Sequence, residues 1–204
     1  MHADGLDALF PGWGFPIIVR PVGSHAGKGL ERVDDPAALA AYLAEAPTEL
    51  FYVSPFVDYA SPDGRFRKYR VVLFDGRPYL AHMAVGDRWM VHYLNAGMDQ
   101  DPAKRAEEAA AMDGFDQGFA RRHAAALAAM HARLGLDLFA IDCAEAPDGS
   151  LLVFEADVAM VVHDLDPADL YPYKKPQMRR LFDAFEGFLR ARLTGQSPAA
   201  SKPG

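Results

Sequence analysis

The sequence is poor in the residues expected of a secreted, membrane or nucleic-acid-binding protein. Its 204 residues include a single cysteine, Cys143, which excludes an internal disulfide and suits a reducing compartment. Lys and Arg number 21 against 28 Asp and Glu, so the net charge of −7 provides no general basic field for a polyanion. No apolar run approaches the ~20 residues that cross a bilayer, and the acidic N-terminus lacks the basic start of a signal peptide. We expect a cytoplasmic protein with no nucleic-acid or membrane partner.

The composition is that of a folded chain, with half of the residues hydrophobic and 24% charged. We expect a lead-in (1–14), a small subdomain with a glycine loop (15–57), a larger α+β subdomain (58–193) and a tail (194–204). The tail is rich in Ser, Pro, Ala and Gly and is predicted to be disordered. Pro55 interrupts an apolar strand near the boundary of the two subdomains and indicates a hinge.

The small subdomain is predicted to contain a strand, a loop, a second strand, a helix and a third strand. These elements are strand 15–22, loop 23–29, strand 30–33, helix 36–46 and strand 50–57. Asp34 or Asp35 is expected to cap the helix, because Pro36 is suited to the first helical position.

The larger subdomain is predicted to contain two hairpins and three helices. They are hairpin 67–75/77–86, helices 103–112 and 119–134, hairpin 138–144/151–158 and helix 175–193. Asp75-Gly76 is a strong hairpin-turn signal, and Gly135 is expected to end the second helix. His82 is expected to pack in the core, and Lys174 to lie on a solvated face paired with Asp166 or Asp169.

The second hairpin brings acidic residues together. If its turn is centred between Asp148 and Gly149, the numbers of facing residues sum to 297, which places Asp142 opposite Glu155. Asp157 projects to the same face because side chains alternate along a strand. The other face is predicted to pack against a core, which makes Cys143 an inert thiol. That apolar face carries Phe139, Ile141, Cys143, Phe154 and Ala156.

The facing carboxylates must be compensated. Two unit charges about 4 Å apart repel by roughly 4 kcal/mol at an effective dielectric of 20. A Mg²⁺ or Mn²⁺ ion would offset this repulsion, and Mg²⁺ commonly binds one or two carboxylates together with phosphate oxygens. Pairing of the carboxylates with Arg or Lys, or exposure at a strand end, remains open as the alternative.

The glycine loop indicates phosphate binding, although it is neither of two well-known phosphate loops. Gly23, Gly27 and Gly29 let backbone N–H groups approach an anion, and a loop between two strands can cover a nucleotide as a flap. The spacing is one residue short of a Walker loop, and Gly29 stands where Ser or Thr would contact Mg²⁺. A strand follows instead of a helix, which excludes the dinucleotide-binding fingerprint. Arg20, just before the loop, supports an anion as the ligand.

These segments resemble the ATP-grasp superfamily, nearest to its glutathione-synthetase and peptide-glutamate ligase branch. The resemblance covers about residues 15–163. It is carried by PIIVRPVGSHAGKGL, FYVSPFVD, RKYRVVLFDGRPYLAHMAV, YLNAGM and IDCAEAPDGSLLVFEAD. It implies an α+β fold in which two α+β subdomains, with antiparallel or mixed sheets and flanking helices, clasp a nucleotide cleft.

The resemblance also implies roles for individual residues. Arg70 would face the phosphate or acyl phosphate, and Asn95 would lie beside the phosphates. The flap would cover the phosphates, the linker backbone would contact adenine, and Asp58 would lie near the ribose. The implied ATP-binding residues are Arg20, Gly23, Ser24, His25, Gly27, Gly29, Pro55, Phe56, Val57 and Asp58. The implied metal ligands are Asp142, Glu155 and Asp157.

The implied activity is an ATP- and Mg²⁺-dependent ligase, with Mn²⁺ as the other candidate ion. It would join a small-molecule or peptide carboxylate to an amine through an acyl phosphate, and the chain would be the enzyme or its ATP-binding portion. The alternatives are a non-catalytic nucleotide-binding module with a regulatory or interaction role, and an acidic α+β domain with a calcium or structural site.

Three features depart from the family pattern. Arg20 and Asp157 stand where Lys and Asn are usual. Members usually carry a further N-terminal domain that helps form the acceptor pocket, whereas fourteen residues precede the first predicted strand here. We expect a missing N-terminal domain, a partner subunit or a second copy of the chain to complete that pocket.

Overall fold

The computed structural model describes residues 11–24, 27–46, 48 and 50–195, which divide into the units Met1–Asp58 and Tyr59–Gly204. The expected disordered tail lies largely outside the described residues, as do the first ten residues of the lead-in.

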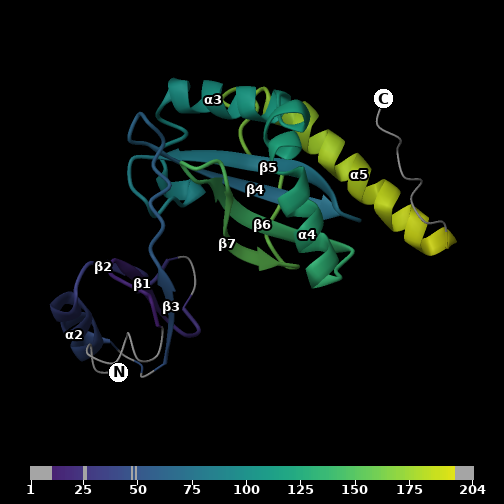
Figure 1. The fold of residues 1–204 in the computed structure, drawn as a ribbon. Coiled ribbons are helices and arrows are strands. Elements are labelled where there is room, and N and C mark those ends of the chain that lie inside the picture. The colour runs from purple at the N-terminus through teal and green to yellow at the C-terminus, as the bar shows by residue number, and fades with distance from the viewer. Residues whose placement is uncertain (1–10, 25–26, 47, 49, 196–204) are drawn as a thin grey trace. The chain divides into compact units, whose positions relative to one another are not determined.

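The first unit contains a three-stranded antiparallel sheet in the order β2-β1-β3 and one helix (Figure 1). Its elements are β1 (Ile17–Pro21), β2 (Glu31–Val33), α2 (Pro36–Glu45) and β3 (Phe51–Pro55). The side chain of Asp35 accepts a hydrogen bond of 2.8 Å from the backbone N–H of Ala38, so Asp35 is the helix cap. The predicted element order is confirmed.

A small apolar core holds the first unit together. Its buried members are at most 2% exposed and come from the central strand β1, from β2 and from the helix: Ile17, Val19, Val33 and Leu39. Tyr42 of α2 packs edge-to-face on Phe51 of β3, with ring centroids 5.8 Å apart. The helix therefore covers one face of this sheet.

The second unit contains a four-stranded sheet in the order β5-β4-β6-β7, in which every neighbouring pair is antiparallel (Figure 1). The strands are β4 (Phe66–Phe74), β5 (Arg77–Gly86), β6 (Leu138–Glu145) and β7 (Leu151–Asp157). The helices are α3 (Pro102–Asp113), α4 (Ala124–Leu134) and α5 (Lys174–Thr194). Both predicted hairpins and the α+β class are confirmed.

Turn and cap residues adopt the conformations that their types favour. Asp75 and Gly76, between β4 and β5, have φ values of 47° and 77°, as a two-residue hairpin turn requires. Gly135 ends α4 with a φ of 63°.

The helix predicted over 119–134 is divided in two. A π-helical turn, Asp116–Ala120, precedes α4, and His123 caps α4 without a side-chain hydrogen bond. The π-helical turn contains Gly118, and glycine weakens an α-helix by about 1 kcal/mol relative to alanine. The turn places the side chain of Phe119, only 4% exposed, in the core.

One face of the sheet packs against the helices. The buried residues of this core include Val71, Leu73, Phe115, Phe119, Leu127, Phe139, Ile141, Cys143, Met178 and Leu181. Burial of Phe139, Ile141 and Cys143 confirms the apolar face predicted for β6. The same prediction was wrong for Phe154, which is 42% exposed, and for Ala156, which is exposed as well. Both lie on β7, the edge strand of the sheet.

Candidate functional site

A row of polar side chains crosses the sheet of the second unit, one from each strand. His82 on β5 faces Arg70 on β4, Arg70 faces Asp142 on β6, and Asp142 faces Glu155 on β7. Facing residues of antiparallel strands project to the same side, so these four side chains share one face of the sheet. A β-bulge lies next to the row on each side of the sheet: Ala81 of β5 is the extra residue opposite Arg70 and Val71, and Phe154 of β7 is the extra residue opposite Asp142 and Cys143. Bulges redirect side chains and are frequent beside active sites.

The bulge in the second hairpin determines which residues face each other. On the turn side of it Cys143 faces Val153, whereas beyond it Asp142 faces Glu155. Without the inserted residue, Asp142 would face Phe154. The predicted pairing of Asp142 with Glu155 is therefore correct, but the predicted position of the turn was wrong by half a residue, and the bulge compensates for that error.

Asp142 is the central acidic group of the row and is held by two cations. Its side chain is 1% exposed. Arg70 donates from Nε to Oδ1 at 2.8 Å and from Nη2 to Oδ2 at 3.0 Å, which is the bidentate geometry of a strong ion pair. Lys68, two residues earlier on β4, places Nζ 2.8 Å from Oδ2. The repulsion expected between Asp142 and Glu155 is therefore offset here by the basic side chains.

The charge state of Asp142 follows from these contacts. Burial alone would raise the pKa of its carboxyl group, but the hydrogen bond from Arg70 and the charge of Lys68 outweigh burial and lower that pKa to about 2. Burial alone would lower the pKa of the Arg70 guanidinium. The hydrogen bond from Arg70 to Asp142 and the nearby charges of Asp142 and Glu155 outweigh burial and raise that pKa. The pair is fully ionised at neutral pH.

The other two predicted metal ligands lie on β7 and are exposed. Asp157 faces Ala140 and accepts a hydrogen bond of 2.9 Å from the backbone N–H of Ala159. Within residues 11–24, 27–46, 48 and 50–195, no group of three or more His, Cys, Asp or Glu side chains is arranged to hold a metal ion. The metal site stays a prediction.

The donor set nevertheless fits a divalent ion bound together with phosphate. An ionised carboxylate offers about four acceptor positions, and the contacts from Arg70 and Lys68 use three of those of Asp142. Glu155, directly opposite, provides a second carboxylate. Two cations beside two carboxylates suit a ligand that carries both anionic oxygens and a hard cation.

Arg70 also anchors the segment that follows β7. Its Nη1 donates to the carbonyl oxygen of Val161 at 3.0 Å. The guanidinium thus joins β6 to the irregular chain between β7 and α5.

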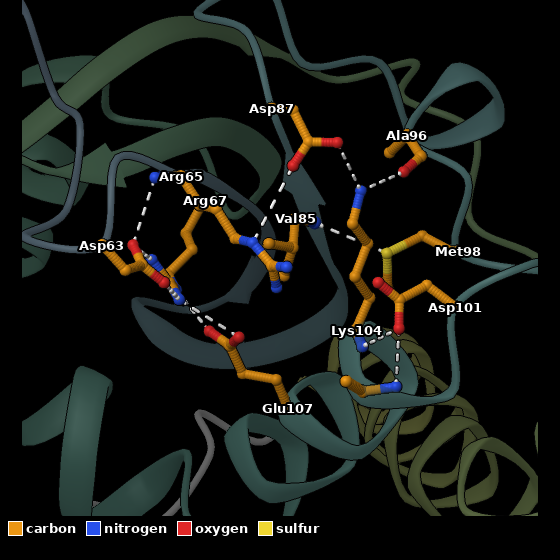
Figure 2. Close-up of polar contacts among 11 residues, drawn as sticks. Asp63, Arg65, Arg67, Val85, Asp87, Ala96, Met98, Asp101, Lys104 and Glu107 are labelled. Atoms are coloured by element: carbon orange, nitrogen blue, oxygen red, sulfur yellow. Dashed lines mark hydrogen bonds and ion pairs between the residues drawn. The ribbon is translucent and has the colours of Figure 1, made fainter.

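Asn95, the other predicted catalytic residue, lies in a one-turn 3-10 helix, Tyr93–Asn95, and is exposed. The loop around it is firmly held by buried groups. Lys104, 5% exposed, donates from Nζ to the carbonyl oxygen of Ala96 at 2.8 Å, and the sulfur of Met98 accepts from the N–H of Val85 at 3.4 Å (Figure 2). Asn95 is therefore presented to solvent on an anchored loop.

Ion pairs fix the start of β4 and of α3 next to that loop (Figure 2). Arg67 binds both carboxylate oxygens of Asp63, at 3.0 and 2.8 Å, and also contacts Glu107 of α3. Lys104 places Nζ 3.2 Å from Asp87. These contacts join the ends of the strands to α3.

A buried polar cluster that the sequence did not reveal centres on Glu108 of α3. This side chain is 0% exposed, and its carboxylate has four partners. Oε1 accepts from the N–H of Met83 at 3.1 Å and lies 3.3 Å from Nζ of Lys174. Oε2 accepts from the hydroxyls of Tyr93 at 3.0 Å and Tyr173 at 2.7 Å. Burial outweighs these partners and raises the pKa of Glu108.

Lys174 completes this cluster. It is 3% exposed, pairs with Asp166 at 2.8 Å and donates to the hydroxyl of Tyr93. Asp166 was one of the two partners expected for Lys174, but the expected solvated face was wrong, since α5 begins inside the fold. The cluster ties the loop of Asn95 to α3, β5 and α5.

His82 joins the row to the Glu108 cluster. Its ring lies 4.6 Å from that of Tyr93. Burial and the charges of Arg70 and Lys174 lower its pKa to about 3, so the imidazole is neutral at physiological pH. The expected packing role is consistent with this placement, but His82 also borders the charged groups.

In the first unit, the glycine loop has the backbone that the sequence predicts. Gly23, Gly27 and Gly29 have φ values of 80°, 73° and 70°, a region that side chains disfavour. Ser24 donates from Oγ to the carbonyl oxygen of Pro21 at 2.8 Å. Tyr42 of α2 donates to the carbonyl oxygen of Gly29 at 2.7 Å. His25 lies outside the described residues.

The remaining predicted nucleotide contacts lie at the ends of β1 and β3. The guanidinium of Arg20 lies 5.1 Å from the ring centre of Tyr52. Pro55 faces Ile17, and Phe56 donates its N–H to the carbonyl oxygen of Pro16 at 3.0 Å. Val57 is 42% exposed, and Asp58 ends the first unit.

The described helices include none that is long and apolar enough to span a membrane.

No family model matches the chain, and no curated protein matches it. Among solved structures, it is similar to the D-cycloserine synthetase DcsG, with 20% identity and a TM-score of 0.41, over 88% of this chain and 60% of that one. An L-amino acid ligase from Bacillus licheniformis matches with 15% identity and a TM-score of 0.41, over 74% of this chain and 34% of the ligase. A biotin carboxylase from Campylobacter jejuni matches with 14% identity and a TM-score of 0.39, over 74% and 32%.

All three are ATP-grasp enzymes, the superfamily that the sequence motifs resemble. The chain spans from about a third to 60% of their lengths. Likeness at these TM-scores carries no activity with it.

Proposed function

We propose that this chain is the ATP-binding portion of an ATP- and Mg²⁺-dependent ligase that joins a carboxylate to an amine through an acyl phosphate. The observation that carries this proposal is the row of His82, Arg70, Asp142 and Glu155 on one face of the sheet, with Lys68 beside it. A triphosphate with a divalent ion would offer oxygens to the cations and the ion to the carboxylates.

The proposed chemistry needs charge and position rather than a protein nucleophile. An oxygen of the substrate carboxylate attacks the γ-phosphorus of ATP, the bond to the β–γ bridging oxygen breaks, and ADP leaves. The amine then attacks the carbonyl carbon of the acyl phosphate, loses a proton and displaces inorganic phosphate. Arg70 and Lys68 would bind phosphate oxygens as charge shifts in the first step. A Mg²⁺ or Mn²⁺ ion held by Asp142 and Glu155 would neutralise phosphate charge when bound.

The other predicted residues belong to the same proposal. In the first unit, the backbone of Gly23, Gly27 and Gly29 suits phosphate, because φ values near 70–80° turn the chain sharply where side chains are absent. In this proposal the linker backbone contacts adenine and Asp58 contacts the ribose. Asn95 and Asp157 are exposed and free of steric cover from the core, so both are available to a ligand.

A thermal-unfolding titration tests whether the nucleotide site exists. A ligand that binds only the folded chain raises its melting temperature, by an amount equivalent to about 2.7 kcal/mol at one hundred times the Kd. We expect ATP with Mg²⁺ to stabilise the chain more than either alone. Glu155→Gln should remove most of this effect, whereas the matched change Glu186→Gln, at an exposed ion pair of α5, should leave it intact.

An assay of ADP release separates the proposed enzyme from its main rival. Release that depends on an added amino acid or peptide would support the ligase. Nucleotide binding without ADP release, in a chain supplied with its full natural length, would favour a non-catalytic nucleotide-binding module. The absence of any stabilisation by ATP with Mg²⁺ or Mn²⁺ would contradict both.

A further inference from the structure

Two cations contact Asp142, and one of them is fixed by more interactions than the other. Arg70 makes two parallel contacts to its carboxylate and a third to the carbonyl oxygen of Val161, so three interactions fix the guanidinium. Lys68 makes one ion-pair contact to Asp142, at 2.8 Å, and its flexible stem ends in a point charge. The side chains of Lys68 and Arg70 are 16% and 19% exposed, so both reach the surface of the sheet. Lys68 is the partner that can leave more easily.

The charges on this face of the sheet, in the row and beside it, are nearly balanced. Asp142, Glu155 and Asp157 contribute three negative charges, and Lys68 and Arg70 contribute two positive ones. A divalent ion arriving alone would gain little from this near-neutral face and would have to compete with Lys68 for Oδ2 of Asp142. An ion arriving with a phosphate is different, because the phosphate oxygens offer Lys68 an equivalent partner.

We propose that Lys68 is a built-in counter-ion that occupies Asp142 until phosphate draws it away, which makes binding of the divalent ion and of the nucleotide cooperative. This inference rests on the proposed function, because it assigns ATP and a divalent ion to this face. Lys68 thus has two roles in succession: it prevents a lone metal ion from occupying the site, and it contacts the phosphate once the nucleotide binds. The coupling is reciprocal, so each ligand raises the affinity for the other by the same factor.

Isothermal titration measures this coupling directly in the full chain. Mn²⁺ is titrated into the protein alone and into the protein saturated with an ATP analogue that cannot transfer its γ-phosphate. We expect weak Mn²⁺ binding to the wild-type protein alone and an increase of about tenfold or more with the analogue, within the usual range of allosteric coupling. Lys68→Met should bind Mn²⁺ alone about tenfold more tightly than wild type, so the analogue should raise its Mn²⁺ affinity by a smaller factor than in wild type, the remaining increase coming from contact of the ion with phosphate.

Two further variants and one control guard against loss of structure. Lys68→Gln keeps a hydrogen-bond donor for Asp142 while removing the charge, and it should behave as Lys68→Met does. Lys68→Arg keeps the charge and should restore coupling. Lys175→Met, at an exposed lysine that pairs with Asp164, should leave both affinities unchanged.

The outcomes distinguish this inference from the proposed function. If the wild-type chain binds the analogue with Mn²⁺, but Lys68→Met and Lys68→Gln bind Mn²⁺ alone no more tightly than wild type, the role of Lys68 is refuted and the nucleotide site stands. If the analogue does not bind the wild-type chain with any divalent ion, the proposed function fails and the coupling fails with it. Tighter binding of Mn²⁺ to both neutral variants, with weaker coupling than in wild type, would support the inference.

Discussion

The ammonium group of Lys174 lies 3.3 Å from Oε1 of Glu108, and the two side chains are 3% and 0% exposed. A buried ion pair of this kind is not by itself a source of stability, because both charges have lost their hydration. Removal of one partner is a different matter, since the other charge is left in the interior. The pair also connects α3 and α5 to the loop of Asn95 through Tyr93.

We therefore expect Lys174→Met to lower the free energy of unfolding by about 3–5 kcal/mol, the usual cost of leaving a buried charge without its partner. Lys175→Met is the matched control, because Lys175 is the next residue and its side chain, which pairs with Asp164, is 47% exposed. It should cost less than about 1 kcal/mol. Urea unfolding of both variants measures the difference, and equal midpoints would show that the Glu108 cluster does not stabilise the fold.

We expect the free energy of unfolding to depend on pH through the carboxyl group of Asp142. Its pKa is about 2 in the folded chain and 3.8 as the ordinary value, so the folded state holds its proton less tightly than the unfolded state. The resulting stabilisation is complete above about pH 4 and is lost as the pH falls toward 2. With 1.36 kcal/mol per pKa unit, it amounts to about 2 kcal/mol.

The measurement is the difference in unfolding free energy between the wild-type chain and Asp142→Asn as a function of pH. The difference should be largest near neutral pH and should shrink between pH 4 and pH 2, because only the wild type loses this ion pair there. A difference that stays constant over this range would mean that Asp142 titrates alike in both states.

In contrast to Asp142, which stays ionised, we expect the imidazole of His82 to stay neutral in the folded chain. Burial, with the charges of Arg70 and Lys174, lowers its pKa from 6.5 to about 3. Between about pH 6.5 and pH 3 the imidazole is protonated in the unfolded chain but not in the folded chain. This group therefore makes the fold less stable as the pH drops through that range. An NMR titration of the ring, assigned with His82→Gln, should show no midpoint between pH 8 and about pH 4. A midpoint near 6.5 would contradict the burial of the ring beside these cations.

Much of the fold could be predicted because local signals agreed with it. Asp75-Gly76 specified a tight turn, Asp35 a helix cap, and the alternation of Phe139, Ile141 and Cys143 a buried strand face. The pairing of Asp142 with Glu155 was also found, but through a turn placed half a residue away and a bulge that no residue type announces. A shift of one residue would have moved one carboxylate to the other face.

The charged interior could not be predicted in the same way. Lys68 lies in the stretch Arg67-Lys68-Tyr69-Arg70, where three basic residues leave no alternation to show which of them turns to the sheet's polar face. Lys104, Glu108 and Met112 are spaced four apart and form the buried face of α3, which is the one signal that could have indicated Glu108. A charged residue at such a position is ordinarily solvated, and only the tertiary partners make its burial tolerable.

Two glycines of the glycine loop, Gly23 and Gly29, both have a positive φ but differ in the space around them. Gly23 and Gly29 have φ values of 80° and 70°, so an alanine at either position adopts a conformation that costs roughly 1–2 kcal/mol. Around Gly23 an added Cβ would meet nothing within 4 Å, whereas at Gly29 it would lie 3.0 Å from two ring carbons of Pro21. Pro21 belongs to β1 and cannot swing aside as a flexible side chain would.

Gly29→Ala should therefore lower the melting temperature clearly more than Gly23→Ala, and it should displace the strand end from which the loop starts. In the nucleotide titration, both variants should weaken binding if the loop contacts phosphate, with Gly29→Ala the more severe of the two. Equal thermal stability of the two variants would show that the loop relaxes around Pro21. Undiminished nucleotide affinity in both would remove the loop from the phosphate site while leaving the sheet face of Asp142 and Glu155 as its remaining candidate.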